Sequence, residues 1–152
     1  VYNELKLTNS IALRSELGIG FAWWGSSSGN SEWAAIPELS VEPRLYYNLS
    51  KRQEKGKRID GNSGNYVSLR CGYQPGVSIS SDNSDFYPSL TVIPMWGIKR
   101  NIGKSFNYEV GVGLGYHWTY KEYTAFYPTN QTIKETDHGV IMGVRLGIGY
   151  KF

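Results

Sequence analysis

Residues 137–152 read DHGVIMGVRLGIGYKF, and this stretch decides the fold class. From Val140 to Phe152 every second residue is large and apolar, whereas the residues between them are mostly glycine or cations. Successive side chains of a β-strand point to opposite faces, so the pattern predicts a strand with one apolar face and one small or charged face. The run is longer than an ordinary strand of roughly 5–6 residues. It suits a tilted strand that crosses a bilayer, which needs about 9–11 residues.

The same alternation recurs along the whole chain, and helical spacing fits it less well than a period of two. In one segment Tyr108, Val110 and Val112 alternate with Glu109 and Gly111. We predict seven strands, at about residues 1–7, 11–24, 33–50, 66–79, 87–100, 105–121 and 138–152. The 152 residues therefore form one all-β domain, residues 1–152, with an antiparallel up-and-down sheet.

Composition agrees with this fold class, since the chain holds 12 Tyr, 5 Trp and 18 Gly. No run of about 18 apolar residues exists, which excludes a transmembrane helix. The mean hydropathy of −0.40 does not exclude a membrane barrel, because only alternate residues of a barrel face lipid. The single cysteine, Cys71, excludes an internal disulfide, and we expect it to be a small lipid-facing residue. The net charge of +3 and the scattered basic residues do not indicate nucleic-acid binding.

Alternation alone does not say which face lies inside, because a soluble barrel buries the apolar face and a membrane barrel shows it to lipid. Glycines crowd the polar face, as a narrow interior requires. The polar face also holds a near-balanced set of charges, and enclosed charges must pair. Its acids are Glu4, Glu16, Glu38, Glu42 and Glu109, and its cations are Lys6, Arg14, Arg44, Arg70 and Arg145. These features favour a transmembrane barrel, and a soluble barrel stays the alternative.

Aromatic residues gather near the predicted strand ends, as they do at the two interfaces of a bilayer. One predicted belt is Trp23, Trp24, Trp33, Tyr116, Trp118 and Tyr120. The other predicted belt is Tyr47, Trp96, Phe106, Tyr108, Tyr150 and Phe152.

The interior of a barrel of about eight strands is just filled by side chains. We predict a lumen charge network of Glu16, Glu38, Glu42, Arg44, Arg70, Glu109 and Arg145. These side chains would plug the lumen, so ion conductance should be negligible and a small pore is only an alternative.

The predicted connections differ in length, which indicates an orientation. Residues 8–10 and 101–104 are short turns, whereas 25–32, 76–85 and 121–136 are longer polar segments. Short turns of outer-membrane barrels face the periplasm, so we expect a periplasmic C-terminus.

The segment 50–65 is the exception, because it falls on the periplasmic side and yet is long. Its cations are Lys51, Arg52, Lys55, Lys57 and Arg58. We expect a solvated, mobile loop, and a contact with anionic lipid headgroups or a periplasmic partner is the alternative.

Seven strands are an odd number, whereas single-chain bacterial barrels have an even number. An open sheet edge in lipid would leave backbone groups unsatisfied. The sequence begins without Met or a signal peptide, and Val1 already lies within a strand pattern. We therefore expect eight strands, with the missing strand before Val1 or with a partner covering the edge.

Several stretches resemble a group of small outer-membrane β-barrel proteins of the Bacteroidetes, similar to OmpX/OmpA-like barrels. They are LKLTNSIALRSELGIG (5–20), VEPRLYYNLSKR (41–52), GNSGNY (61–66), IPMWGIKRNIGKSFNYEVGVGLGY (93–116) and VRLGIGYKF (144–152). The resemblance implies an eight-stranded barrel, a cleaved signal sequence and no established activity. The ending GIGYKF also resembles the signal that the barrel-assembly machinery reads, which implies that Gly147, Tyr150 and Phe152 are the residues read.

The sequence offers no catalytic constellation. It has no zinc-ligand spacing or nucleotide fingerprint, and GVGLG (111–115) lies within a strand with no helix after it. Some outer-membrane barrels are lipid A deacylases or acyltransferases that use a His with a Ser and an acid. His117 lies near the outer belt, but it points inward and lacks the lipid-facing His–Ser pair of those enzymes. We expect no catalytic residue, cofactor or metal.

The sequence therefore predicts an integral outer-membrane barrel with a plugged, charge-paired lumen that acts as a non-enzymatic structural or accessory subunit of an envelope complex. The expected partners are outer-membrane lipid, the barrel-assembly machinery during biogenesis and other envelope proteins, with no nucleic acid. The alternative is a barrel that binds surface ligands through residues 25–32, 76–85 and 121–136.

Overall fold

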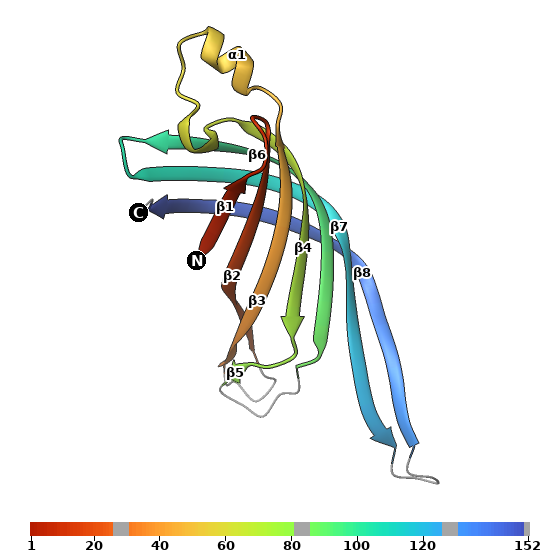
Figure 1. Ribbon diagram of the computed structural model, residues 1–152. Coiled ribbons are helices and arrows are strands. Elements are labelled where there is room, and N and C mark those ends of the chain that lie inside the picture. Colours follow the sequence, from red (N-terminus) through yellow and green to blue (C-terminus); the bar gives the residue numbers. More distant parts are fainter. Residues whose placement is uncertain (26–30, 81–85, 126–130, 151–152) are drawn as a thin grey trace.

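The computed structural model describes residues 1–25, 31–80, 86–125 and 131–150, which form one antiparallel sheet (Figure 1). Its strands are β1 (Tyr2–Lys6), β2 (Ile11–Gly25), β3 (Ser31–Tyr46), β4 (Asn65–Pro75), β6 (Pro88–Ile102), β7 (Phe106–Ala125) and β8 (Gln131–Tyr150). They lie in the order β1-β2-β3-β4-β6-β7-β8, and the short β5 (Ile79–Ser80) pairs with β3. The predicted seven-stranded up-and-down antiparallel sheet is confirmed.

The sheet curls strongly but does not close (Figure 1). Within the described ranges, β1 pairs only with β2, and β8 pairs only with β7. At one end the edge strands β1 and β8 come near each other, because the Tyr2 hydroxyl of β1 lies 3.3 Å from Asn107 Oδ1 of β7 and 2.9 Å from a Cβ atom built on Gly149 of β8. The closed barrel therefore stays a prediction.

The two faces of the sheet differ in the way that the alternation predicts. On β7, Asn107 and Glu109 are buried, whereas Tyr108, Val110 and Val112 are exposed. The face toward which the sheet curls is called the inner face here, and the opposite one the outer face. Most charged and small residues lie on the inner face, together with a few apolar ones such as Ile93 and Met95, and most large apolar residues lie on the outer face.

The β7–β8 hairpin continues beyond the rest of the sheet (Figure 1). Beyond Thr119, β7 pairs with β8 alone among the described strands, and this ladder reaches Ala125 and Gln131. The prediction of a long loop at residues 121–136 is thus wrong, because 121–125 and 131–136 belong to strands. Residues 126–130 lie outside the described residues. Its polar residues had suggested a loop, but they form cross-strand pairs such as Glu122 and Lys134, 2.7 Å apart.

The other predicted long segments shorten in the same way. β2 extends to Gly25 and β3 begins at Ser31, so both ends of the predicted segment 25–32 belong to strands. Its remaining residues, 26–30, lie outside the described residues. The predicted strand 66–79 instead ends at Pro75, and β5 follows it as a separate short strand.

The predicted mobile loop at residues 50–65 is folded instead. β3 ends at Tyr46, short of the predicted residue 50, and α1 (Leu49–Glu54) follows it. Leu49 is only 6% exposed and packs with Tyr46 and Tyr66, while Ile59 packs against the same cluster. These apolar anchors explain why the segment folds, and the density of cations had masked them. No helix among the described residues has the length and apolarity that a membrane crossing requires.

The 3₁₀ helix η1 (Asp60–Asn62) covers one end of the curled sheet. Asn101 Nδ2 donates to the carbonyl oxygen of Asp60, and Asn62 Nδ2 donates to Glu4 Oε1 on the inner face of β1. Asn62 has a positive φ of 59°, a conformation that asparagine tolerates better than most residues. The segment from α1 to η1 is therefore a cap on the interior.

Candidate functional site

A cluster of paired charges fills the inner face of the sheet near the capped end. It comprises the carboxylates of Glu4, Glu16, Glu42 and Glu109 and the cations of Arg14, Arg44, Lys99 and Arg145. All these side chains are less than one-tenth exposed except Glu16, which is 27% exposed. Equal numbers of acids and cations satisfy one another, as burial requires. We call this set the inner charge cluster.

Arg44 on β3 lies at the centre of the inner charge cluster. Its Nη2 atom lies 2.7 Å from Glu109 Oε1 and 2.9 Å from Glu42 Oε2, and its Nη1 atom lies 3.3 Å from Glu4 Oε2. The guanidinium also lies over the Tyr66 ring, 4.3 Å from its centroid. One side chain therefore joins β3 to both β1 and β7.

Glu109 on β7 pairs with three cations, more than any other acid of the inner charge cluster. Arg14 Nη1 of β2 donates to it at 2.9 Å, and the Tyr66 hydroxyl of β4 donates to it at 2.5 Å. Arg145 Nη1 of β8 lies 3.4 Å away. Of these strands only β8 adjoins β7, whereas β2 and β4 do not. The carboxylate therefore connects opposite walls of the curled sheet.

Arg145 holds the C-terminal strand to the opposite wall. Its Nη2 atom lies 2.9 Å from Glu42 Oε2 on β3 and 3.6 Å from Glu16 Oε2 on β2. Ser68 also donates to Glu42 Oε1, at 2.6 Å. These ion pairs connect β8 to β2 and β3 across the interior, where β1 and β8 do not pair in the described part of the sheet.

The structure brings five residues of the predicted lumen network into the inner charge cluster: Glu16, Glu42, Arg44, Glu109 and Arg145. The other two, Glu38 and Arg70, form a separate pair at 2.6 Å, with side chains 23% and 22% exposed. Lys6, which the pattern placed on the polar face, is exposed.

Sequence reasoning missed Lys99, whose Nζ atom lies 2.9 Å from Glu4 Oε2. The signal was available, because Lys99 continues the inward alternation of Ile93, Met95 and Gly97 beyond the last residue that the pattern considered. The buried ring of Tyr66 was also missed as an inner-face residue, whereas the alternation of residues 37–49 already places Tyr46 on the polar face, where it is buried. Their signal is the same period of two, since each follows the polar face of its own strand.

Some inner-face glycines make room for these rings. A Cβ atom at Gly97 would collide with the Tyr66 ring, and one at Gly113 would collide with the backbone oxygen of Pro94. At Gly18 and Gly147, in contrast, nothing lies within 4 Å of a built Cβ atom. The expectation that a narrow interior requires glycine therefore holds at particular positions rather than at all of them.

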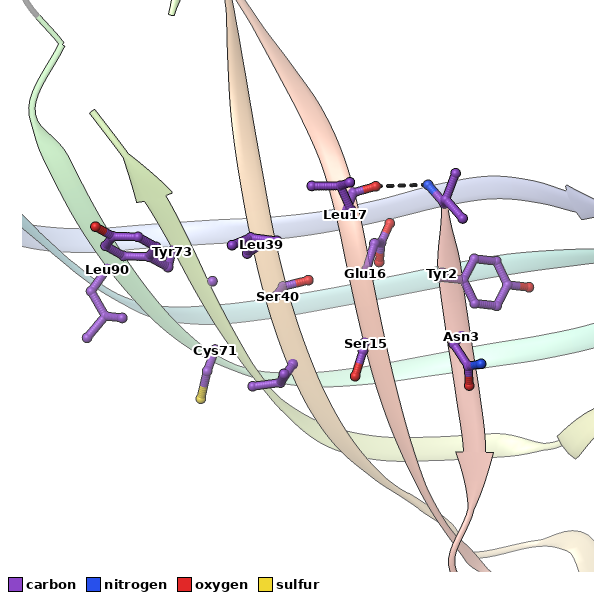
Figure 2. Close-up of a pocket in the computed structure, with 13 residues that line it drawn as sticks. Tyr2, Asn3, Ser15, Glu16, Leu17, Leu39, Ser40, Cys71, Tyr73 and Leu90 are labelled. Carbon is purple, nitrogen blue, oxygen red and sulfur yellow. Dashed lines mark hydrogen bonds between the residues drawn. The ribbon is translucent and has the colours of Figure 1, made fainter. Parts of the chain in front are cut away.

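The outer face carries a shallow apolar groove of about 920 Å³. Figure 2 shows its lining on β1, β2, β3, β4 and β6, which includes Asn3, Ser15, Leu17, Leu39, Cys71, Tyr73 and Leu90. Cys71 lies opposite Val41 and Val92 in the sheet and is a free, half-buried thiol on this face. Its predicted position on the apolar face is therefore where the structure places it.

The predicted aromatic belts fall at the two ends of the outer face. Tyr47, Trp96, Phe106, Tyr108 and Tyr150 are exposed at the end that α1 caps, and Phe106 packs edge-on to Tyr150. Trp33 and Tyr120 are exposed toward the other end, where Tyr116 contacts Trp118. The side chains of Trp23 and Trp24, and all of Phe152, lie outside what the structure describes.

Two further sets of predicted residues are the assembly signal at the end of β8 and the basic residues of segment 50–65. Gly147 and Tyr150 lie in the last four residues of β8, and Phe152 of the same predicted assembly signal is outside the described residues. Among the basic residues, Arg58 pairs with Asp60 at 2.8 Å, and Arg52 Nη2 donates to the carbonyl oxygen of Arg58. The hydrogen bonds from Arg58 hold the pKa of the Asp60 carboxyl below its usual value.

The histidine considered for catalysis has no hydrogen bond to a serine or an acid within the described part of the chain. The His117 ring lies against Gly139 of the neighbouring strand. Across the described ranges, no group of three or more His, Cys, Asp or Glu side chains could hold a metal ion. Comparisons with protein-family models, with curated proteins and with solved structures found no match.

Proposed function

We propose that this chain forms the wall of a small transmembrane β-barrel in the bacterial outer membrane, with its C-terminus in the periplasm. In this proposal the interior is plugged by the inner charge cluster. The protein acts as a non-enzymatic structural or accessory subunit of an envelope complex.

One observation carries the proposal: large apolar side chains are exposed while charged side chains are buried. On β8, Leu146 and Ile148 are 77% and 78% exposed, whereas Arg145, which directly precedes Leu146, is 8% exposed. In water this arrangement would be unfavourable by roughly 25 cal/mol for each Å² of exposed apolar area. In lipid it is favourable, because hydrocarbon bathes the apolar face.

An eighth strand between β1 and β8 is part of the proposal. The free edge of β8 is long, since the strand spans 20 residues and pairs only with β7 among the described strands. Unpaired backbone groups in hydrocarbon cost several kcal/mol each, so an open edge would be unstable there. The proximity of Tyr2 to Asn107 supports closure by a single strand, supplied by a segment before Val1 or by a partner.

The filled interior favours an accessory role over a pore. Arg44 is fully shielded and Arg145 nearly so, and η1 caps one end. The outer surface and the exposed ends are then the parts that contact other envelope proteins. We expect no stable conductance from the purified protein in planar bilayers, and a porin-sized conductance would contradict this part of the proposal.

The test is to express the chain, with an outer-membrane signal sequence, in a Gram-negative host. We expect it in the outer-membrane fraction after urea washing, with a folded band on gels that shifts on heating. Extraction in native detergent followed by mass spectrometry then identifies copurifying envelope proteins. A monomer recovered in the soluble fraction would refute the membrane proposal, and a lone monomer in detergent would refute the accessory role.

A further inference from the structure

The capped end carries two arginines, Arg52 and Arg100, that interact electrostatically. Arg100 is on the outer face of β6, and Arg52 is on α1 within electrostatic reach of it. Neither forms a salt bridge with any carboxylate in the described ranges. Like charges repel, so an anion bound between the two guanidiniums would relieve this repulsion.

The Arg100 guanidinium is held by a chain of hydrogen bonds along the outer face. Its Nη2 atom donates to Asn65 Oδ1, and its Nη1 atom donates to the carbonyl oxygen of Lys99 at 2.7 Å. Asn65 Nδ2 in turn donates to the Tyr47 hydroxyl oxygen at 3.4 Å, and Trp96 Nε1 donates to the same oxygen at 2.8 Å. The Tyr47 hydroxyl thus accepts two hydrogen bonds, and its own proton is left to be donated.

Arg52 contributes a second fixed guanidinium with spare donors. Its Nη2 atom donates to the carbonyl oxygen of Arg58 at 3.0 Å, which orients the side chain. Its Nε atom is shielded from solvent and has no hydrogen-bond partner among the described residues.

The capped end near the two guanidiniums carries both aromatic and cationic residues. Tyr47 and Trp96 are 52% and 43% exposed and belong to the aromatic belt at this end. The nearby segments carry the further cations Lys51, Lys55, Lys57 and Lys104. Of the two acids in residues 47–64, Asp60 is bound by Arg58, which leaves only Glu54.

We propose that Arg52, Arg100 and the Tyr47 hydroxyl bind the phosphate of a phospholipid headgroup in the membrane leaflet at the α1 end. This inference rests on the proposed function. Guanidinium groups bind phosphate oxygens through paired N–H donors. The site lies where an aromatic belt meets an apolar surface, so the acyl chains of the same lipid would lie on the outer face. A free phosphate ion would gain nothing from that surface.

The experiment measures lipid binding to the full chain in detergent micelles by native mass spectrometry. Dioleoylphosphatidylglycerol is the probe, and dioleoylglycerol, which lacks the phosphate, is its matched control. We expect the first to bind and the second not to bind. In the double variant Arg52→Gln/Arg100→Gln, the binding constant should fall at least about tenfold, because each lost charge-assisted hydrogen bond is worth about one such factor or more.

The control variant Lys51→Gln/Lys55→Gln removes the same number of positive charges from α1 and the residue after it without touching the site, and its binding should change less than about twofold. Tyr47→Phe should weaken binding, and Arg100→Lys should weaken it less than Arg100→Gln does. These single variants keep the test decisive if the double variant loses the heat-shifted band that marks a folded barrel.

Equal losses in the two double variants would overturn the proposal in favour of a general attraction to basic residues. Equal binding of dioleoylglycerol would overturn it too, as would displacement of the lipid by inorganic phosphate at the same concentration. These outcomes differ from a failure of the membrane proposal, which would show as a wild-type chain that stays monomeric in water without detergent.

Discussion

Arg44 Nη2 on β3 lies 2.7 Å from Glu109 Oε1 on β7, although β4 and β6 separate these two strands in the sheet. The contact crosses the interior rather than following the sheet. It therefore shows that the curl of the sheet and the pairing of buried charges are one structural feature. Each strand from β1 to β8, except the short β5, contributes to the charges, rings or hydroxyls of this interior.

The first prediction concerns the centre of the inner charge cluster. Glu109→Gln keeps the shape of the side chain but leaves Arg14, Arg44 and Arg145 with an excess of positive charge. Removing one partner of a buried ion pair typically costs about 3–5 kcal/mol. We expect a loss of about that size in the free energy of unfolding, measured by urea titration in lipid vesicles. Glu122→Gln, in an exposed pair, is the control, and equal midpoints for the two variants would contradict the account.

The second prediction uses the glycines of the inner face. Gly97→Ala should destabilise the sheet by about 1–3 kcal/mol, because the new methyl group would displace the Tyr66 ring that donates to Glu109. Gly18→Ala should have no such cost, since open space surrounds a Cβ atom there. The same urea titration measures both. Equal effects of the two alanines would mean that the Tyr66 ring does not occupy the space beside Gly97.

The third prediction concerns the outer face of β7. Val112 is 53% exposed and lies midway between Phe106 and Trp118, so it would be near the bilayer midplane. Val112→Arg should cost about 2–4 kcal/mol in lipid vesicles, whereas the same change at an interfacial position should cost about 0–1 kcal/mol. Tyr120→Arg on the same face is that control. A Val112→Arg variant as stable as the control would place this surface in water.

The fourth prediction concerns pH and the cap. Arg58 donates two hydrogen bonds to Asp60, which hold the pKa of that carboxyl below its usual value of 3.8. The contribution to stability is therefore present above that value and is lost as the pH falls through the lowered pKa. We expect hydrogen exchange of residues 58–63 to accelerate below about pH 4, relative to the intrinsic rate.

At neutral pH, Asp60→Asn should reproduce this loosening as faster trypsin cleavage within residues 51–58. Glu54→Gln is the matched control, because Glu54 has no ion-pair partner among the described residues. Unchanged cleavage in Asp60→Asn would show that the pair with Arg58 does not hold the cap.

The sequence predicts the strands and their faces well because one signal, the period of two, determines both. Once Glu109 is assigned to the inner face and Val110 to the outer face, the alternation assigns a face to each remaining residue of β7. The same reasoning reached Arg44 and Arg145, since each lies at a polar position of its own strand. It did not pair them, because partners across the interior depend on the curl of the sheet and not on spacing within a strand.

The errors occurred where polarity was taken as a sign of a loop. Glu122 and Lys134 lie in a hairpin that is polar on both faces, so the alternation vanishes although the strands continue. The cations of residues 50–65 similarly masked Leu49 and Ile59, which anchor the cap to Tyr46 and Tyr66. Closure of the sheet could not be derived from these residues, because it depends on a strand that would lie between β1 and β8.

The most direct test of the central claim is a spin-label scan along β7. Labels are placed one at a time at Val110, Gly111, Val112 and Leu114 in a Cys71→Ser background, and the protein is reconstituted in lipid vesicles. We predict that the labels at 110, 112 and 114 are accessible to oxygen, which concentrates in hydrocarbon, but not to a water-soluble nickel chelate. The label at 111 should be poorly accessible to both. High accessibility of the three outward labels to the nickel chelate would contradict the account, because it would place the apolar face in water.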